Sequence, residues 1–126
     1  MVFTLFPVKV KRNITRRGYN TDQERDASFR KTIFSIPKGK VSTYARVAEG
    51  SGYPLYHRSV ARLLRKETLT SLPWQRIVGS GGEIRLKGEL AEEQRFRLRR
   101  EGVRFEGERV NMSKYQHHLE SWNIWE

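Results

Sequence analysis

The sequence predicts a mainly α-helical domain of the winged helix-turn-helix class, with a small β-hairpin as the wing. Two helical segments, at residues 43–48 and 57–66, are separated by a turn with two glycines and a proline, which is the layout of a helix-turn-helix. A glycine-rich stretch at 79–82 lies between the apolar pair at residues 77–78 and residues 83–86, where charged and apolar residues alternate, and predicts the hairpin. A length of 126 residues fits one domain.

Composition restricts the function classes. The formal net charge of +11 indicates a polyanionic partner, with nucleic acid as the first candidate. No basic amphipathic helix stands alone and no apolar run is long enough to span a bilayer, so we expect no membrane partner. Cysteine is absent, which excludes disulfides, thiolate zinc sites and a cysteine nucleophile. We therefore expect an intracellular protein that needs no cofactor and no metal.

The first 24 residues differ from the rest of the chain in charge. Five basic residues fall between Lys9 and Arg17, and no acidic residue precedes Asp22. We interpret residues 1–24 as a basic extension, which either adds contacts to phosphates or is a solvated leader without a specific role. Residues 25–115 then form the folded domain, and residues 116–126 form a C-terminal tail.

The first helix is predicted over residues 27–35. Asp26 is in the N-cap position, and three apolar residues fall on one face: Phe29, Ile33 and Phe34. Residues 36–40 end the helix, because Pro37 restricts the residue before it and Gly39 allows a positive φ.

The next two helices form the predicted helix-turn-helix. Ser42 or Thr43 caps a short helix whose inner face carries Val47 and Ala48. The helix over residues 57–66 is amphipathic, with an apolar stripe made by Val60, Leu63 and Leu64. Its other face carries arginines at spacings of four and three residues, namely Arg58, Arg62 and Arg65. An arginine face can be merely solvated, but together with the net charge it indicates contact with DNA.

The last helix is predicted over residues 88–100. Its inner side is expected to carry four residues: Leu90, Ala91, Gln94 and Leu98. Gly102 ends this helix, and Val103 and Phe105 predict a short extended segment. The pattern places no element in residues 111–126.

A Pro-Trp pair at residues 73–74 is unusual in mid-chain. On its own it fits a turn followed by a core tryptophan, since most tryptophans are largely buried. Three motifs change that interpretation: residues 36–44 (Ile-Pro-Lys-Gly-Lys-Val-Ser-Thr-Tyr), 58–61 (Arg-Ser-Val-Ala) and 72–78 (Leu-Pro-Trp-Gln-Arg-Ile-Val). With them the chain resembles the DNA-binding domain of the O6-alkylguanine-DNA alkyltransferases, and more closely the alkyltransferase-like proteins. The resemblance covers about residues 28–115 and implies the fold of the alkyltransferase C-terminal domain.

The resemblance implies that Trp74 stands where the alkyltransferases have the cysteine that accepts the alkyl group. An indole does not attack an sp³ carbon, and no cysteine exists elsewhere in the chain. Gln75 replaces the histidine that would activate a thiol, and an amide is no general base at neutral pH. Glu101 matches the acidic residue that orients this histidine, and we expect it to accept hydrogen bonds near the pocket. Alkyl transfer is thereby excluded, and we expect no enzymatic activity.

The resemblance also implies that the groups that recognise DNA are retained. Arg58 matches the arginine finger that enters the base stack in place of the extruded nucleotide, a role that suits a guanidinium. Tyr44 matches the tyrosine that meets the target phosphate, and Ser59 matches the small residue beside the minor-groove floor. Trp74 is expected to form the floor of a nucleotide pocket, because aromatic stacking on a base contributes ~1–3 kcal/mol.

Further contacts are expected around this pocket. Gln75 and Arg76 belong to the predicted lesion-binding residues, and the basic lip carries Arg85 and Lys87, either of which could read the O6 or N7 acceptor of guanine. Contacts to backbone phosphates are expected from three residues: Thr43, Arg62 and Arg65.

The leading interpretation is a protein that binds duplex DNA through the minor groove and flips O6-alkylguanine into a pocket without repairing it. Its expected partners are double-stranded DNA containing O6-alkylguanine and nucleotide excision repair proteins, which would receive the lesion, and its expected state is a monomer. It would be cytoplasmic and nucleoid-associated in a bacterium or archaeon, and nuclear in a eukaryote.

Two alternatives remain open. The first is a winged-helix regulator or architectural protein in which Trp74 is a core residue and no lesion pocket exists. The second, a hydrolase that uses Glu101 with His117 or His118, is distant, because no nucleophile or metal-ligand spacing accompanies these histidines.

Overall fold

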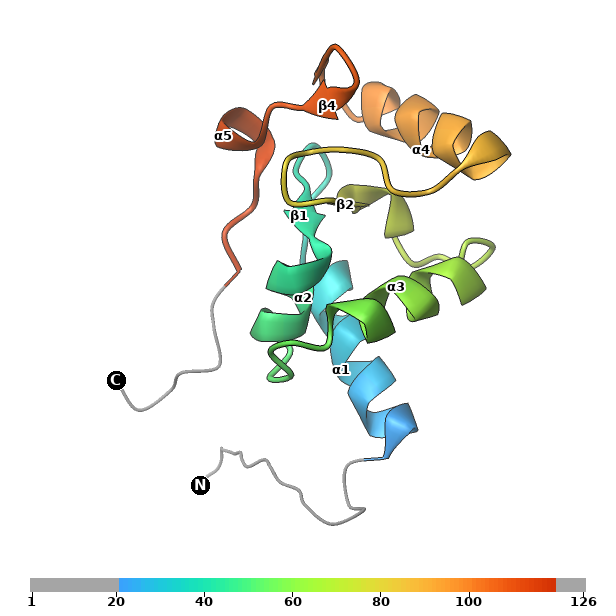
Figure 1. The fold of residues 1–126 in the computed structure, drawn as a ribbon, viewed down its shortest axis with the longest axis vertical. Helices are drawn as coiled ribbons and strands as arrows, with labels where there is room; N and C mark the ends of the chain where they lie inside the picture. Colours follow the sequence, from blue (N-terminus) through green and yellow to red (C-terminus); the bar gives the residue numbers. More distant parts are fainter. Residues whose placement is uncertain (1–20, 120–126) are drawn as a thin grey trace.

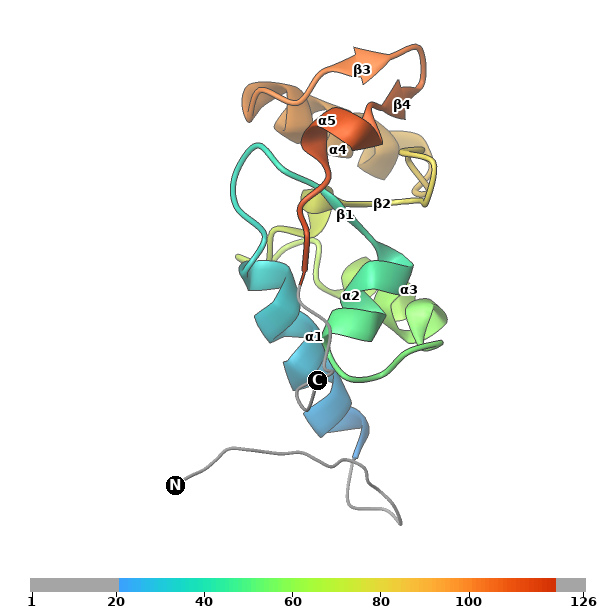
Figure 2. The same ribbon diagram turned by 90° about the vertical axis from the view of Figure 1, so that its left-hand side faces the viewer.

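Two groups of helices lie on either side of a short pair of strands (Figures 1 and 2). The computed structural model describes residues 21–119, so residues 1–20 of the predicted basic extension and residues 120–126 of the predicted tail lie outside the described part. In chain order the elements are α1 (Asp22–Phe34), β1 (Ser42–Thr43), α2 (Tyr44–Gly50), α3 (His57–Lys66), a 3₁₀ helix (Trp74–Arg76), β2 (Ile77–Val78), α4 (Gly88–Arg100), β3 (Phe105–Glu106), β4 (Arg109–Val110) and α5 (Met112–Tyr115). The mainly helical fold class is confirmed.

Helix α1 begins more than one turn earlier than predicted. Thr21 is its N-cap and forms a capping box, in which the amide of Glu24 donates to the Thr21 hydroxyl and the amide of Thr21 donates to the Glu24 carboxylate, each at 3.1 Å. The predicted cap at Asp26 is therefore wrong, because two reciprocal hydrogen bonds already start the helix upstream of it. Phe29 and Ile33 are buried as predicted, but Phe34 is exposed.

Helices α2 and α3 form the predicted helix-turn-helix, and α2 packs against both α1 and α3 (Figure 1). The hydroxyl of Thr43 accepts a hydrogen bond of 3.1 Å from the amide of Arg46 and so caps α2. Helix α3 has the predicted bounds, and the predicted apolar stripe is buried in the core: Val60, Leu63 and Leu64. Burial of this stripe leaves the arginine face of α3 exposed to solvent.

Strand β2 does not form the predicted wing hairpin. It pairs in parallel with β1, and both of its residues are buried, as is typical of a parallel pair covered on both faces. A hydrogen bond of 2.8 Å from the amide of Gly79 to the carbonyl of Glu83 closes the segment that follows. Residues 79–87 therefore form a loop, here called the 79–87 loop, and a single bridge between Glu83 and Arg109 joins it to β4.

The antiparallel hairpin lies further along the chain, in β3 and β4, where the sequence pattern predicted only an extended segment. Helix α5, which was not predicted, follows directly. The start of the predicted tail is attached to the domain at Val41, whose amide donates to the carbonyl of Tyr115 at 2.9 Å and whose carbonyl accepts from the amide of His117 at 2.7 Å. This attachment fixes the segment that follows α5 beside the residue that precedes β1.

Two clusters of buried side chains support these elements. The larger cluster lies among α1, α2, α3 and the 3₁₀ helix and includes Phe29, Leu63 and Trp74. The smaller cluster lies under α4 and the hairpin and includes Leu98 and Val110. On α4 the predicted inner residues are buried except Leu90, which is exposed. Between residues 21 and 119, no helix is long and apolar enough to cross a membrane.

Candidate nucleic-acid interface

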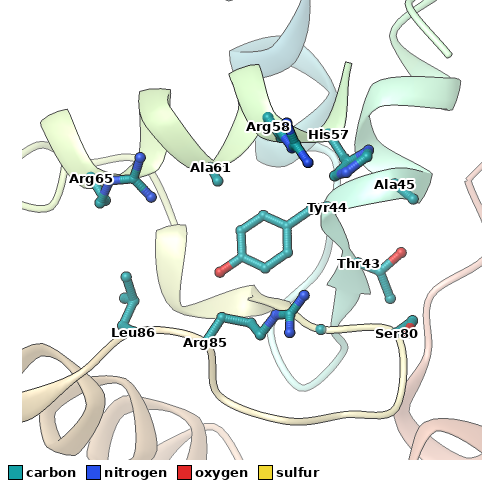
Figure 3. A pocket seen from close by; sticks show the side chains of 11 residues that line it. Thr43, Tyr44, Ala45, His57, Arg58, Ala61, Arg65, Ser80, Arg85 and Leu86 are labelled. Carbon is teal, nitrogen blue, oxygen red and sulfur yellow. The ribbon is translucent and has the colours of Figure 1, made fainter. Parts of the chain in front are cut away.

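A cavity of about 520 Å³ opens between α3 and the 79–87 loop, and Figure 3 shows it from close by. Helix α3 forms one wall, the loop forms the opposite wall, and the start of α2 closes one end (Figure 3). The lining residues are Thr43, Tyr44, Ala45, His57, Arg58, Ala61, Arg65, Gly79, Ser80, Arg85 and Leu86. This lining contains three arginines and no carboxylate, so the cavity suits an anionic or electron-rich ligand.

The wall formed by α3 presents Arg58, Ala61 and Arg65, which share one face because they are three and four residues apart. The methyl group of Ala61 leaves the wall open between the two guanidinium groups (Figure 3). Within the described part of the chain, neither arginine forms an ion pair with a carboxylate. Their charges are therefore available to a polyanion.

Tyr44, the first residue of α2, places its ring in the middle of the cavity (Figure 3). The ring is half-buried and packs against the larger core cluster. This burial raises the pKa of the Tyr44 hydroxyl, although the charges of Arg85 and Arg65 act in the opposite direction. The hydroxyl therefore stays protonated at neutral pH and can donate a hydrogen bond to a ligand.

The opposite wall is held in place by the β4 strand. The amide of Val110 donates to the carbonyl of Gly82 at 2.9 Å, and a Cβ atom at position 82 would collide with the backbone of Val110, at a φ of +87°. Only glycine allows this approach. The loop then presents Arg85, whose side chain is 62% exposed and lies 3.7 Å from Glu83, and Leu86, which packs against the larger core cluster.

Trp74 is a core residue in this structure. Its side chain is 1% exposed, and it does not line the cavity. The guanidinium of Arg97 on α4 lies 5.1 Å from the centre of its ring system, and its Nε1 has no hydrogen-bond partner among the described residues. The expectation that Trp74 itself forms the exposed pocket floor is therefore wrong for this conformation. The 3₁₀ helix turns the indole into the core, and Tyr44 and Leu86 cover that core on the cavity side.

Gln75 and Arg76 also point away from the cavity and bind Glu101 instead. The amide nitrogen of Gln75 donates to the Glu101 carboxylate at 2.7 Å, and Arg76 donates to both oxygens of that carboxylate at 3.0 Å. Arg76 donates a further hydrogen bond of 2.9 Å to the carbonyl of Ile36. Burial alone would raise the pKa of Glu101, but the hydrogen bonds from Arg76 and Gln75 and the charge of Arg76 outweigh it and hold this pKa below its ordinary value. Glu101 is thus a charged structural acceptor, as predicted.

Comparison with known proteins shows the family to which the chain belongs. The family model for the DNA-binding domain of 6-O-methylguanine DNA methyltransferase matches residues 25–103. The chain belongs to this family. The alkyltransferase-type fold predicted from the sequence is thereby confirmed, together with the resemblance to alkyltransferase-like proteins.

Two curated members of the family are similar to this chain over its central part. A DNA base-flipping protein of Vibrio parahaemolyticus is 46% identical over 72 residues, which are 56% of this chain and 72% of that protein. Alkyltransferase-like protein 1 of Schizosaccharomyces pombe is 40% identical over 74 residues, which are 56% of this chain and 68% of that protein.

Solved structures of the family have the same fold. Atl1 of S. pombe, in complex with damaged DNA containing O6-carboxymethylguanine, matches with a TM-score of 0.68 at 30% identity, covering 76% of this chain and 96% of that one. The O6-methylguanine methyltransferase of Mycobacterium tuberculosis matches with a TM-score of 0.57 at 19% identity, over 75% of this chain and 52% of that one, which shows a shared fold alone.

The structure brings together some of the predicted site residues of this family member and separates others. Five of them line the cavity: Thr43, Tyr44, Arg58, Arg65 and Arg85. Six others predicted to contact DNA do not, namely Ser59, Arg62, Trp74, Gln75, Arg76 and Lys87, and neither does Glu101. Of these six, Arg62 and Lys87 are exposed near the cavity walls, where contact with phosphates stays a prediction. Thr43 is buried, and its hydroxyl is already engaged as the cap of α2.

Six lining residues are not among the predicted site residues: Ala45, His57, Ala61, Gly79, Ser80 and Leu86. Ala61 could have been found, because it lies three residues after Arg58 on the same helical face. Ser80 carries no such signal, since the path of the 79–87 loop depends on its attachment to β4. In the described residues 21–119, no cluster of histidine and carboxylate side chains could hold a metal ion, and neither His117 nor His118 lines the cavity.

Proposed function

We propose that this protein recognises O6-alkylguanine in duplex DNA by flipping the damaged nucleotide into the cavity between α3 and the 79–87 loop. The protein holds the base there and leaves the alkyl group in place. It then hands the persistent complex to nucleotide excision repair. The observation that carries this proposal is the cavity itself, in which the predicted finger Arg58 and the predicted phosphate contact Tyr44 face the same space.

The geometry supports base flipping in two ways. Arg58 lies in the first turn of α3, exposed and without an ion-pair partner among the described residues, so its guanidinium is free to enter a base stack. The cavity beside it lies in the size range of small-molecule pockets, roughly 300–1,000 Å³. Extruding a base costs a few kcal/mol, less for a lesion that already pairs badly. The name of the V. parahaemolyticus relative, a DNA base-flipping protein, agrees with this proposal.

Retention of the alkyl group follows from the side chains available. The chain has no cysteine, and we propose that Trp74 occupies the position of the alkyl acceptor found in the enzymes of the family. The buried indole belongs to the core cluster against which Tyr44 and Leu86 pack, so it stabilises the position of these two residues. In place of the phosphate contact expected from the sequence, we propose that the ring of Tyr44, which lies in the cavity, stacks on the flipped base (Figure 3).

The burial of Trp74 agrees with the competing hypothesis of a winged-helix regulator. That hypothesis requires Trp74 to be a core residue, which the structure shows, but it also requires that no lesion pocket exists, and the cavity between α3 and the loop is the candidate for such a pocket. The two hypotheses therefore differ in what the cavity binds.

Paired binding measurements test this proposal. Fluorescence anisotropy with two duplexes that differ only in one O6-methylguanine should give clearly tighter binding of the damaged duplex, because flipping and stacking favour the lesion. Mass spectrometry of the recovered DNA should show the methyl group still on guanine. Equal affinities for the two duplexes at moderate salt would support the regulator instead, and loss of the methyl group would contradict a protein without alkyl transfer.

The handover to excision repair has a separate test. In a reconstituted incision assay with an excision nuclease, adding the protein should raise incision near O6-methylguanine, while incision of the undamaged duplex stays unchanged. If the protein instead protects the lesion from incision, the handover is wrong even where lesion binding holds.

A further inference from the structure

The turn that joins α2 to α3 (Figure 1) holds a leucine in a backbone conformation that leucine rarely adopts. A hydrogen bond of 3.1 Å from the amide of Tyr56 to the carbonyl of Tyr53 closes this turn. Its two central residues are Pro54 and Leu55, and Leu55 has a φ of +77°. This is the geometry of a type II turn, whose third residue is normally glycine or asparagine because φ is positive there. Among residues 21–119, Leu55 is the only non-glycine residue with a positive φ, which strains its backbone.

Packing within the described part of the chain does not offset this strain. Leu55 is 91% exposed and belongs to neither cluster of buried side chains. Its neighbours hold the turn instead, because the ring of Tyr53 meets those of Tyr56 and Phe29 edge to face, with centroids 5.7 and 5.9 Å away. The turn is thus anchored on α1, while its leucine stays in solvent. A strained and exposed apolar side chain indicates a functional contact, since the fold does not require it.

The turn is fixed to the helix that carries the predicted finger. The carbonyl of Tyr56 accepts a hydrogen bond of 3.2 Å from the amide of Val60, so α3 follows the turn directly. Leu55 lies three residues before Arg58, and their Cα atoms are therefore at most about 11 Å apart. Residues 50–66, which span the turn and α3, include no acidic residue. The distance corresponds to about three base-pair steps, so a duplex whose base stack contains Arg58 also covers Leu55.

We propose that Leu55 inserts into the minor groove as an apolar wedge, within about three base pairs of Arg58, and unstacks a base step there. This inference rests on the proposed function, which places α3 against the minor groove. Proteins that kink DNA from this groove insert leucine, methionine or phenylalanine between base steps. A side chain can enter a base step only if the protein itself does not bury it, which is the state of Leu55. The turn keeps leucine at a glycine position because the side chain serves DNA binding.

A second exposed leucine differs from Leu55 in its backbone and in its surroundings. Leu69, which is 98% exposed, follows α3, and its φ is not positive. It lies two residues after Glu67, whose carboxylate pairs with Arg30 at 2.6 Å. Leu69 is therefore a matched control, because it is an exposed leucine without this strain and outside the segment that lacks acids.

The experiment measures DNA bending, affinity and stability for three variants. Each protein is titrated onto duplexes with and without O6-methylguanine that carry a donor and an acceptor fluorophore at opposite ends, so that energy transfer reports the bend. Leu55→Gly should bind the damaged duplex about tenfold more weakly, because an apolar contact is lost, and should lose most of the rise in energy transfer. Its urea midpoint should rise, because glycine fits the positive φ. Leu55→Met should retain most of the bend, and Leu69→Gly should bind and bend DNA as the wild type does.

Opposite changes in binding and stability distinguish a wedge from a structural residue. If Leu55→Gly lowers both the affinity and the urea midpoint, Leu55 supports the fold and the inference is wrong. If Leu55→Gly binds and bends the damaged duplex as the wild type does, the inference is overturned while lesion recognition stands, and a contact of Leu55 with a partner protein is then favoured. If the wild type binds both duplexes equally but Leu55→Gly loses the bend on both, the proposed function fails and the wedge is supported.

Discussion

The arginines of α3 and those around α4 are chemically identical and are used in opposite ways. Helix α3 contains no acidic residue, and its three arginines are exposed and, in the described part of the chain, without ion pairs. Helix α4 contains three glutamates, and its Arg95 and Arg97 pair with Glu92 at 2.9 Å and with Glu93 at 2.7 Å. The glutamates of α4 therefore engage Arg95 and Arg97, whereas the charges of all three arginines of α3 stay available to a polyanion.

Arg76, which lies beside the end of α4, makes its ion pair inside the protein. Its side chain is 16% exposed, and it binds a carboxylate that is 10% exposed. It lies two residues after Trp74, within the motif expected to contact the lesion. Arg76 therefore stabilises the fold through Glu101, whereas the arginines of α3 face solvent.

The largest effect is expected at Arg76, whose side chain is partly buried. Arg76→Ala removes both bonds to Glu101 and the bond to the carbonyl of Ile36, and it leaves a partly buried carboxylate without its cation. We expect the free energy of unfolding to fall by about 3 kcal/mol, as measured by urea denaturation at pH 7. The exposed variant Arg62→Ala should change it by less than about 0.5 kcal/mol. Similar losses for the two variants would contradict the distinction between internal and exposed arginines.

The next largest effect is a loss of DNA binding, and it is expected at Arg58 in the first turn of α3. Arg58→Ala should weaken binding of a duplex with O6-methylguanine by about 2 kcal/mol, roughly 30-fold, because the extruded base loses the group that replaces it. The undamaged duplex should lose much less. Anisotropy titrations with both duplexes measure this, and Arg95→Ala on α4 is the matched control. An equal loss for both duplexes would show that Arg58 is an ordinary phosphate contact.

A smaller effect is expected at Arg62, which is exposed on α3 but does not line the cavity. Arg62→Ala should weaken damaged and undamaged duplexes alike and reduce the slope of log K against log salt by about 1, since one phosphate contact is lost. Arg95→Ala should leave this slope unchanged, because its charge is already paired with Glu92 and Glu108. An unchanged slope for Arg62→Ala would remove it from the interface.

The smallest effect concerns pH. The pKa of Glu101 is held below its ordinary value of 4.5 in the folded protein, so its stabilising contribution is present above that ordinary value and is lost as the pH falls through the folded pKa. Glu101→Gln lacks this ionisation. Urea denaturation from pH 7 to pH 3 should therefore show a wild-type advantage at neutral pH that shrinks below about pH 4.5. A constant difference across this range would show that the charge of Glu101 does not contribute.

Much of the fold could be predicted because it follows from local signals. The bounds of α3 and α4 come from apolar periodicity and from the residues that end each helix, and the cap at Thr43 is a short-range hydrogen bond. The wing could not be placed correctly. Residues 77–78 carry β-branched side chains that suit any strand, and their pairing with β1 depends on a contact distant in sequence.

The site was predictable where it depends on helical spacing and less so where it depends on packing. The positions of Arg58 and Arg65 on one face follow from the period of α3. The burial of Trp74 is what the Pro-Trp pair indicates on its own, but the resemblance favoured a pocket floor, and the direction of the indole depends on the 3₁₀ helix and on packing against Arg97 of α4. Likewise, the pairing of Arg76 with Glu101 joins residues 25 positions apart.

Fluorescence of 2-aminopurine tests the central claim most directly, which is that the exposed arginine of α3 holds a flipped nucleotide in the cavity. The probe is placed next to O6-methylguanine in a duplex, where its emission rises when the neighbouring base leaves the stack. Wild-type protein and Arg95→Ala should raise the emission on the damaged duplex far more than on the undamaged one, and Arg58→Ala should abolish most of this rise at saturating protein. Saturated binding of the damaged duplex without any rise in emission would contradict the account.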